Sequence, residues 1–405
     1  MYIKAMTHRD ELFRLTMRWM NDDFYPEDGK TVSRIFLLEN AIASVVTGKL
    51  IDFLDRLFDG PLRMERVRQK QVLRERILHY LPNKTSRNNF LTENFRQNPE
   101  YFFPRLPLDA VILTTQASRL VATGRIKQQS RIAEKVSFRM VDALFQEIQA
   151  EARGIAAQRA AAAGIPLTDL KSSPESMQED FIRAEAKVAG HFKDNNVQIE
   201  PGKMCLNDLI GFKIICRQEL MDRIPELLSR EPGIRIMETE HHSGIYKAVN
   251  LLVEIDLPAP EKLAAHLEEF DWSIAVHRGL NPDELRRQIP DYVIQGAGRV
   301  QMEIILTTYD ELMESEFGRS IHELRILRLR QRQTYSGLVA QNVAYLVEYL
   351  LALAFSPTVE IPELPVKIYG RYLPETITAS KWALYGYEKD DLVINAFCPK
   401  GYCSG

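Results

Sequence analysis

The sequence predicts a sheet domain of the α/β or α+β class with large added helical regions. In the second half of the chain, short apolar or alternating runs typical of strands are separated by runs with helical spacing. The first half favours helix, and its alanine-rich run stops at Gly164-Ile165-Pro166, a sequence that ends helices. Strands that alternate with helices are expected to form a sheet covered by helices.

The N-terminal part of the chain is expected to be helical. Apolar side chains recur at three- and four-residue spacing between Leu37 and Phe58. We interpret the basic residues 63–76 as the solvated face of a helix. Proline-containing residues 99–107 break the pattern and mark a boundary. The sequence therefore predicts an N-terminal helical region over residues 1–109.

A second, larger domain is expected over residues 110–330. Its first part, 110–163, again favours helix, and residues 137–200 are expected to be a helical insertion. Strands are then predicted at residues 209–216, 234–239, 246–255, 272–276 and 300–308. Helices are predicted at residues 218–230, 260–270 and 309–330. The C-terminal region, 331–405, should contain a helix at 338–355 and strand-like pieces at 366–369 and 392–397.

Composition and charge limit the class of protein. With 45% hydrophobic and 26% charged residues, the chain has the composition of a soluble globular protein. A net charge of −3 gives no overall field that would recruit nucleic acid or an acidic membrane, so any anion site must be local. Four cysteines fit a reducing cytoplasm, and the N-terminus has no apolar signal core. We therefore expect a cytoplasmic protein with no membrane partner, and self-association is left open.

Glu303 is the strongest candidate for a functional residue. It lies in the middle of the predicted strand 300–308, where its neighbours are apolar. A carboxylate in such a strand is costly unless it is paired, bound to a metal or used in catalysis. The position is therefore a candidate site on physical grounds alone.

Two further segments carry charged residues that suit a phosphate site. Asp208 comes at the start of an apolar strand with Lys213 five residues on, an arrangement that can hold Mg²⁺ beside phosphates. Taken alone, Asp208 is more often a residue that caps a turn. Arg125, Lys127 and Lys135 follow a glycine and can bind phosphate or stack on a base, although alone they are more often a solvated face.

A third segment begins a strand after a glycine-containing loop. Alternation predicts Tyr246 and Asn250 on one face of that strand and Lys247 on the other. A tyrosine at such a strand start can stack on a nucleobase, although a plain amphipathic strand is the commoner case. Beyond Glu303, the helix 309–330 contains Gly318 at a position where close packing is expected.

In this order, the segments resemble the synthetase domain of RelA/SpoT-type alarmone synthetases. The family pattern runs G-R-x-K with a following I-x-x-K/R, then D-L-I with a later R-I, then G-Y-x-S/A-x-H, and last E-I-Q-I-R-T and A-E-x-G-x-x-x-H. The residues that match are Gly124, Arg125, Lys127, Ile132, Lys135, Asp208, Leu209, Ile210, Ile214, Tyr246, Ala248, Glu303, Ile304, Thr308, Glu316, Gly318 and His322. The chain departs from the pattern at Lys213, Asn250, Ile305 and Thr307, where the family has arginine, histidine, glutamine and arginine. The matched segments, 110–136 and 200–330, cover under half of the chain.

The resemblance implies an α+β, mixed-sheet, nucleotidyltransferase-like fold and an ATP-dependent pyrophosphotransferase. Such an enzyme transfers pyrophosphate from ATP to the 3′-hydroxyl of GDP or GTP and makes a (p)ppGpp-type alarmone, with Mg²⁺ as cofactor. Glu303 would be the general base, and Asp208 and Glu303 would hold the metal. Arg125 would grip the adenine and Tyr246 the guanine. The nucleotide-binding set would be completed by Lys127, Lys135, Lys213, Lys247, Asn250 and His322.

Three alternatives stay open at this point. The acceptor could be the 3′ end of tRNA, as in some toxic members of the group. The substitutions at Lys213, Asn250 and Thr307 could instead mark a non-catalytic nucleotide-binding or regulatory module. Finally, the motif matches could be coincidental, in which case Asp208 and Glu303 should lie far apart.

Overall fold

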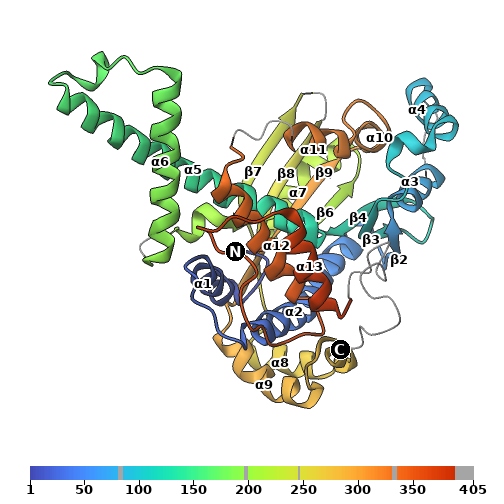
Figure 1. The fold of residues 1–405 in the computed structure, drawn as a ribbon. Coiled ribbons are helices and arrows are strands. Elements are labelled where there is room, and N and C mark those ends of the chain that lie inside the picture. Colours follow the sequence, from blue (N-terminus) through green and yellow to red (C-terminus); the bar gives the residue numbers. More distant parts are fainter. Residues whose placement is uncertain (81–84, 196–198, 245–246, 331–334, 388–405) are drawn as a thin grey trace, which may run out of the picture.

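The computed structural model describes residues 1–80, 85–195, 199–244, 247–330 and 335–387 (Figure 1). Its centre is a mixed sheet of seven strands in the order β2-β3-β4-β6-β9-β8-β7. Only β6 and β9 pair in parallel; every other neighbouring pair in this sheet is antiparallel. The expected α+β class is therefore confirmed. The strands are β2 (Arg63–Gln69), β3 (Pro107–Thr114), β4 (Leu120–Ile126), β6 (Ile210–Ile215), β7 (Ile234–Ser243), β8 (Lys247–Asp256) and β9 (Arg299–Thr307).

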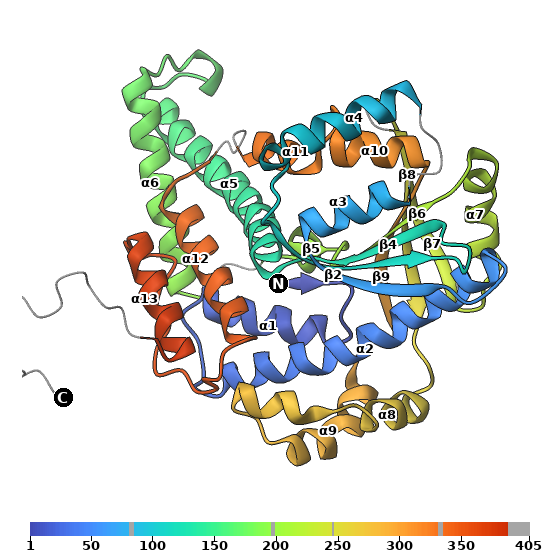
Figure 2. The same cartoon turned by 90° about the vertical axis from the view of Figure 1, so that its right-hand side faces the viewer.

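Helices cover both faces of this sheet. Figure 2 shows α2 on one side of β2, β3 and β4, and α3, α4, α10 and α11 on the other. The bounds are α1 (Arg9–Met20), α2 (Asp28–Leu57), α3 (Lys70–His79), α4 (Ser86–Gln97), α5 (Gln129–Ala162), α6 (Pro174–Lys193), α7 (Gln218–Arg230), α8 (Pro260–Glu268), α9 (Pro282–Gln295), α10 (Tyr309–Phe317), α11 (His322–Arg330), α12 (Leu338–Leu353) and α13 (Pro374–Tyr385). A second, small sheet pairs β1 (Tyr2–Ile3) with β5 (Cys205–Leu206) in parallel. No helix among the described residues is long and apolar enough to cross a membrane.

The two faces of the sheet differ in character. On one face, the apolar side chains of β6, β8 and β9, such as Phe212, Leu251 and Ile304, belong to the main hydrophobic core together with α2. On the other face, a smaller core joins Ile112 and Ile215 to apolar residues of α3, α4 and α10. This second core covers β2 and β3 and part of β4 and β6. The remainder of that face, across β4, β6, β9 and β8, carries the polar residues described below.

A helical hairpin projects from the body of the protein. α5 and α6 run as a pair away from the sheet, as both views show. Arg159 of α5 forms a 2.5 Å ion pair with the buried Asp180 of α6. The helices expected within residues 137–200 are present as α5 and α6. Lys135 lies in the second turn of α5.

Two stretches expected to be helical form strands instead. Residues 63–69 are the edge strand β2, in which Val67 is buried and the arginines are exposed. Charged side chains are common on exposed edge strands, which is why this run has the composition of a solvated helix. The expected helix from residue 110 is also wrong at its start, because β3 and β4 form a hairpin before α5 begins. The sheet therefore extends across the expected boundary at residue 109.

Other expected elements are confirmed or need correction in detail. The strands predicted at residues 209–216, 234–239, 246–255 and 300–308 are β6, β7, β8 and β9 in the described residues. The segment 272–276 is a 3-10 helix, in which the Asp271 side chain accepts a 2.9 Å hydrogen bond from the Ser273 amide. The helix 309–330 is broken at Gly318, whose backbone leaves the helical region. Residues 366–369 form no strand and include a turn at residues 368–369, and residues 392–397 lie outside the described residues.

Candidate active site

Strand register brings four of the predicted residues to one face of the sheet. Arg125 of β4 pairs with Gly211 of β6, which pairs with Glu303 of β9. Side chains of paired residues, and of residues two positions apart, point to the same face of a sheet. Lys213 lies two residues beyond Gly211, and Asn250 of β8 pairs with the residue two positions beyond Glu303. Arg125, Lys213, Asn250 and Glu303 therefore share the polar face.

This part of the face is accessible although its strands are central. Glu303, Lys213 and Asn250 are each partly exposed, whereas their neighbours in the chain are mostly buried on the opposite face. Gly211 contributes no side chain here, and a Cβ atom at this position would lie 3.6 Å from Oε2 of Glu303. The Asn250 amide donates a weak 3.4 Å hydrogen bond to Oε1 of Glu303. Glu303 thus lies on a partly exposed polar surface, and its carboxylate accepts this one weak hydrogen bond from Asn250.

Two lysines hold Asp208 where three elements meet. Lys127 directly follows β4, Lys135 lies in the second turn of α5, and Asp208 lies just before the start of β6. Nζ of Lys127 donates to Oδ2 of Asp208 at 2.9 Å and to its backbone carbonyl at 2.8 Å. Lys135 forms a second ion pair with the same carboxylate oxygen. All three side chains are at most half-exposed, so their charges are only partly screened by water.

The two carboxylates of the site affect each other. Desolvation, and next the charge of Asp208, raise the pKa of Glu303 above its usual value, while Lys127 and Lys135 act in the opposite direction. For Asp208, desolvation acts to raise the pKa, but Lys127 and Lys135 outweigh it and hold the pKa at about 2. Asp208 and Glu303 therefore occupy one electrostatic neighbourhood.

Arg125 and Lys213 both approach a buried acid to which the sequence assigned no role in the site. Nη2 of Arg125 donates to Oε1 of Glu316 at 2.8 Å, and Glu316 is 1% exposed. Nζ of Lys213 donates to the hydroxyl of Ser315 at 3.2 Å. Desolvation, opposed by the charge of Glu316 and assisted by the charge of Arg125, lowers the pKa of Lys213 to about 8. Arg125 is therefore paired with a buried carboxylate where it lies on the polar face.

The remaining predicted residues lie at the edges of this site. His322 begins α11 and is exposed, but desolvation by the surrounding protein and the charges of Arg125 and Lys70 lower the pKa of its imidazole to about 3. It is therefore neutral at pH 7. Lys247 begins β8 with an exposed side chain on the face opposite Asn250, as alternation predicted. Tyr246 lies outside the described residues.

The donor atoms of the site suit one hard divalent cation. Mg²⁺ takes oxygen ligands and is usually held by one or two protein carboxylates together with substrate phosphates and water. Asp208 and Glu303 supply two such carboxylates. No group of three or more His, Cys, Asp or Glu side chains that could hold a metal occurs within the described ranges. The residues therefore fit Mg²⁺ that arrives with a nucleotide better than a metal held by the protein alone.

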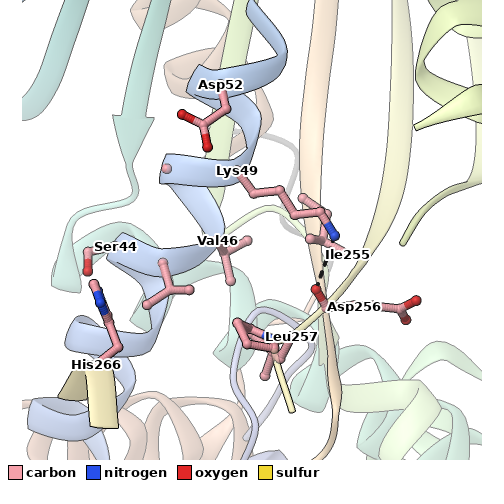
Figure 3. A pocket seen from close by; sticks show the side chains of 11 residues that line it. Ser44, Val46, Lys49, Asp52, Ile255, Asp256, Leu257 and His266 are labelled. Carbon is pink, nitrogen blue, oxygen red and sulfur yellow. Dashed lines mark hydrogen bonds between the residues drawn. The ribbon is translucent and has the colours of Figure 1, made fainter. Parts of the chain in front are cut away.

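A separate cavity lies away from these residues. It has a volume of about 470 Å³ and is lined by α2, the end of β8 and α8. Figure 3 shows Lys49 of α2 reaching toward the backbone carbonyl of Asp256, with Val46 and Leu257 nearby. The lining contains none of the predicted site residues. The cavity is therefore no part of the carboxylate and lysine site on the polar face.

Comparisons with protein families and with curated proteins give no match to this chain. No family model matches the sequence, and a search of curated proteins finds no significant match.

Proposed function

We propose that this protein is an ATP-dependent pyrophosphotransferase with a nucleotidyltransferase-like fold, resembling a GTP pyrophosphokinase. The observation that carries the proposal is the joint environment of Asp208 and Glu303: two carboxylates beside two lysines on an open polar face of the sheet. Transfer of phosphoryl groups depends on positioning, cations and charge stabilisation more than on covalent chemistry by the protein. The arrangement supplies all three.

Glu303 is assigned the role of general base. It takes the proton of the acceptor 3′-hydroxyl, and the 3′-oxygen forms a bond to the β-phosphorus of ATP. The bond between that phosphorus and the oxygen bridging it to the α-phosphate breaks, and AMP leaves with the electron pair. A carboxylate with a raised pKa accepts a proton more readily than an ordinary one.

The cations of the site are assigned to the donor nucleotide. Mg²⁺, held by Asp208 and Glu303, would neutralise charge on the transferred phosphates. Lys127 and Lys135, which contact Asp208 at present, would turn to those phosphates when the divalent cation arrives. Lys213 and Arg125 extend the positive surface along the same face of the sheet. Lysine at position 213 offers a point charge where the family has a planar guanidinium, so its contact with phosphate would be less directional.

The acceptor is proposed to be GDP or GTP. Asn250 lies beside Glu303, where its amide can hydrogen-bond a sugar hydroxyl or a base but carries no charge at any pH. A tRNA 3′ end presents a comparable ribose hydroxyl. The exposed arginines of β2 at the edge of the sheet, Arg66 and Arg68, give that acceptor some support, but both form ion pairs with Asp109.

A non-catalytic nucleotide-binding module is the second candidate. It is favoured by Thr307, which stands where the family has an arginine. It is also favoured by the two lysines that neutralise Asp208. Under this reading the protein binds ATP or GTP and responds to them without turnover.

The test uses the full chain, Mg²⁺ and ATP labelled at its terminal phosphate. GDP, GTP and tRNA are offered separately, and product is resolved together with released AMP. Label in a guanosine product, with an equal amount of released AMP, supports the proposal. Label in tRNA would identify tRNA as the acceptor in place of GDP or GTP. Nucleotide binding without label in any acceptor supports the module. Absence of both binding and transfer rejects all three readings.

A further inference from the structure

Four charged side chains form a buried network between α3 and the α10–α11 segment. Lys70 and Arg74 of α3 are 1% and 0% exposed, and Glu316 and Glu323 are also buried. Nζ of Lys70 lies 2.6 Å from Oε2 of Glu316 and 3.1 Å from Oε1 of Glu323. Arg74 lies 3.0 Å from Glu323 and donates to the backbone carbonyl of Glu316. Two cations and two carboxylates balance in charge, as buried groups require.

The network extends beyond this balanced set to the open face. The second carboxylate oxygen of Glu316, Oε1, accepts from Arg125 of β4 at 2.8 Å. The adjacent Ser315 accepts from Lys213 of β6 and donates to the carbonyl of Leu312 at 2.9 Å. The last turn of α10 therefore holds the two basic residues that the polar face presents. Arg125 and Lys213 add two positive charges to a set that is already neutral.

We propose that Glu316 is a positioning residue. Its carboxylate, paired with Lys70, fixes Arg125 on the polar face, and together with Ser315 it fixes Lys213 there. Arg125 and Lys213 then meet the phosphates of the donor nucleotide. The inference rests on the proposed function, since it assigns Arg125 and Lys213 to ATP. Glu316 itself is buried and does not contact the ligand. One carboxylate oxygen of Glu316 faces Lys70 of α3, and the other faces Arg125. This single carboxylate therefore links α3 to the cations of the site.

The geometry explains why a carboxylate is needed at position 316. A glutamine of the same shape has one acceptor oxygen, which can serve either Lys70 or Arg125 but not both. The amide nitrogen would then face a cation, and Arg125 or Lys70 would turn away. A fixed guanidinium loses less freedom when it binds phosphate than a mobile one, and this difference appears as affinity. Releasing Arg125 should therefore weaken nucleotide binding without touching the carboxylates that perform the chemistry.

The experiment compares MgATP binding, by calorimetry, in the full-length protein and four variants. Glu316→Gln should raise the dissociation constant for MgATP about tenfold, the effect expected when a charge-assisted contact is lost. Glu316→Asp keeps the charge and should recover part of that loss. The double variant Lys70→Met with Glu316→Gln removes both buried charges together and should fold, because replacing a buried ion pair by uncharged groups is often close to neutral. It should bind MgATP as weakly as Glu316→Gln.

Asp180→Asn is the matched control. Asp180 is another buried carboxylate paired with an arginine, but it lies in the α5–α6 hairpin. This variant should lose stability and keep the wild-type affinity for MgATP. Wild-type affinity in folded Glu316→Gln or in the double variant overturns the positioning role, as does an equal loss in Asp180→Asn. If Glu316→Gln does not fold, the double variant decides. If the wild-type protein does not bind MgATP, the proposed function falls and this inference falls with it.

Discussion

The carboxyl groups of Asp208 and Glu303 shift their pKa values in opposite directions although the same two lysines act on both. The pKa of Asp208 is held at about 2 because it contacts Lys127 and Lys135 directly. The pKa of Glu303 is raised by desolvation and by the charge of Asp208. Two neighbouring acids with pKa values pushed apart are the usual basis for dividing roles in catalysis. Asp208 stays ionised to attract a cation, and Glu303 is able to accept a proton.

The first prediction concerns the general base. Glu303→Gln should lower kcat for pyrophosphate transfer by about 10²–10⁴-fold, because an amide cannot accept the proton of the 3′-hydroxyl. The dissociation constant for ATP should change much less. The measurement is steady-state release of AMP with GDP or GTP as acceptor, together with ATP titration.

Glu254→Gln is the control for that variant. Glu254 lies on the same face at the far end of β8, where it pairs with Arg235 at 3.1 Å. It should retain activity within a few-fold, since it is paired at the surface and distant along the strand from Asn250. Full activity in Glu303→Gln would remove the general-base assignment. Equal losses in both variants would indicate general damage to the sheet.

The second prediction is a bell-shaped pH profile of kcat/KM for ATP. The acid limb reflects protonation of Glu303, and because its pKa is raised, activity should fall at a higher pH than for an ordinary carboxylate. The alkaline limb reflects loss of the Lys213 charge. With a pKa lowered to about 8, Lys213 is cationic below that pH and neutral above it. Activity should therefore decline as the pH rises through about 8.

Lys213→Arg tests the alkaline limb. A guanidinium stays charged at every pH used, so this variant should keep its affinity for ATP well above pH 8. The acid limb should not move. An alkaline limb that remains near pH 8 in Lys213→Arg would show that another group is responsible.

The residues of this site can be predicted from the sequence more readily than the residues with which they pair. Strands β6, β8 and β9 could be predicted because buried strands give continuous or alternating apolar runs, and Glu303 interrupts one of them. The contact between Arg125 and Glu316 could not be predicted, because these residues are 191 positions apart in the chain. Pairing of that kind is decided by the topology of the sheet, not by local pattern. Burial of Lys70 could not be predicted either, since lysine is almost never fully buried unless it is paired.

Strands β2, β3 and β4 could not be predicted from the sequence, for a different reason. β2 exposes most of its side chains, so it lacks a clear apolar alternation. β3 and β4 bury residues on both faces, as at Ile112 and Leu113, so their runs carry no period that distinguishes strand from buried helix. Only the turn between them could have given a signal. The site therefore depends on a strand, β4, whose apolar run does not distinguish a strand from a buried helix.

The third prediction concerns Lys135. Lys135→Met should weaken MgATP binding about tenfold, because the phosphates lose one cation. Its effect on the free energy of unfolding should be small, within about 1 kcal/mol, since its ion pair with Asp208 is partly exposed. Thermal melting and ATP titration together separate the two effects. Lys187→Met, which removes an exposed ion pair with Glu151 on the projecting hairpin, should change neither affinity nor stability by more than this amount.

The fourth prediction separates packing from ligand binding at Gly124. The glycine precedes Arg125, a placement that suggests a backbone approach to phosphate. In the structure a Cβ atom at this position would lie 2.8 Å from the ring of Phe212 and 2.9 Å from Val111, on the apolar face. Gly124→Ala should therefore lower the free energy of unfolding by about 1–3 kcal/mol, the usual cost of overpacking a core.

Gly48→Ala provides the comparison for that measurement. Gly48 lies within α2, where a Cβ atom would meet nothing within 4 Å. Alanine there should raise the free energy of unfolding by about 0.5–1 kcal/mol, because alanine favours helix over glycine. Denaturant unfolding of both variants and ATP titration of folded Gly124→Ala complete the test. If Gly124→Ala keeps its stability but loses ATP binding, the glycine serves the ligand and the packing explanation is wrong.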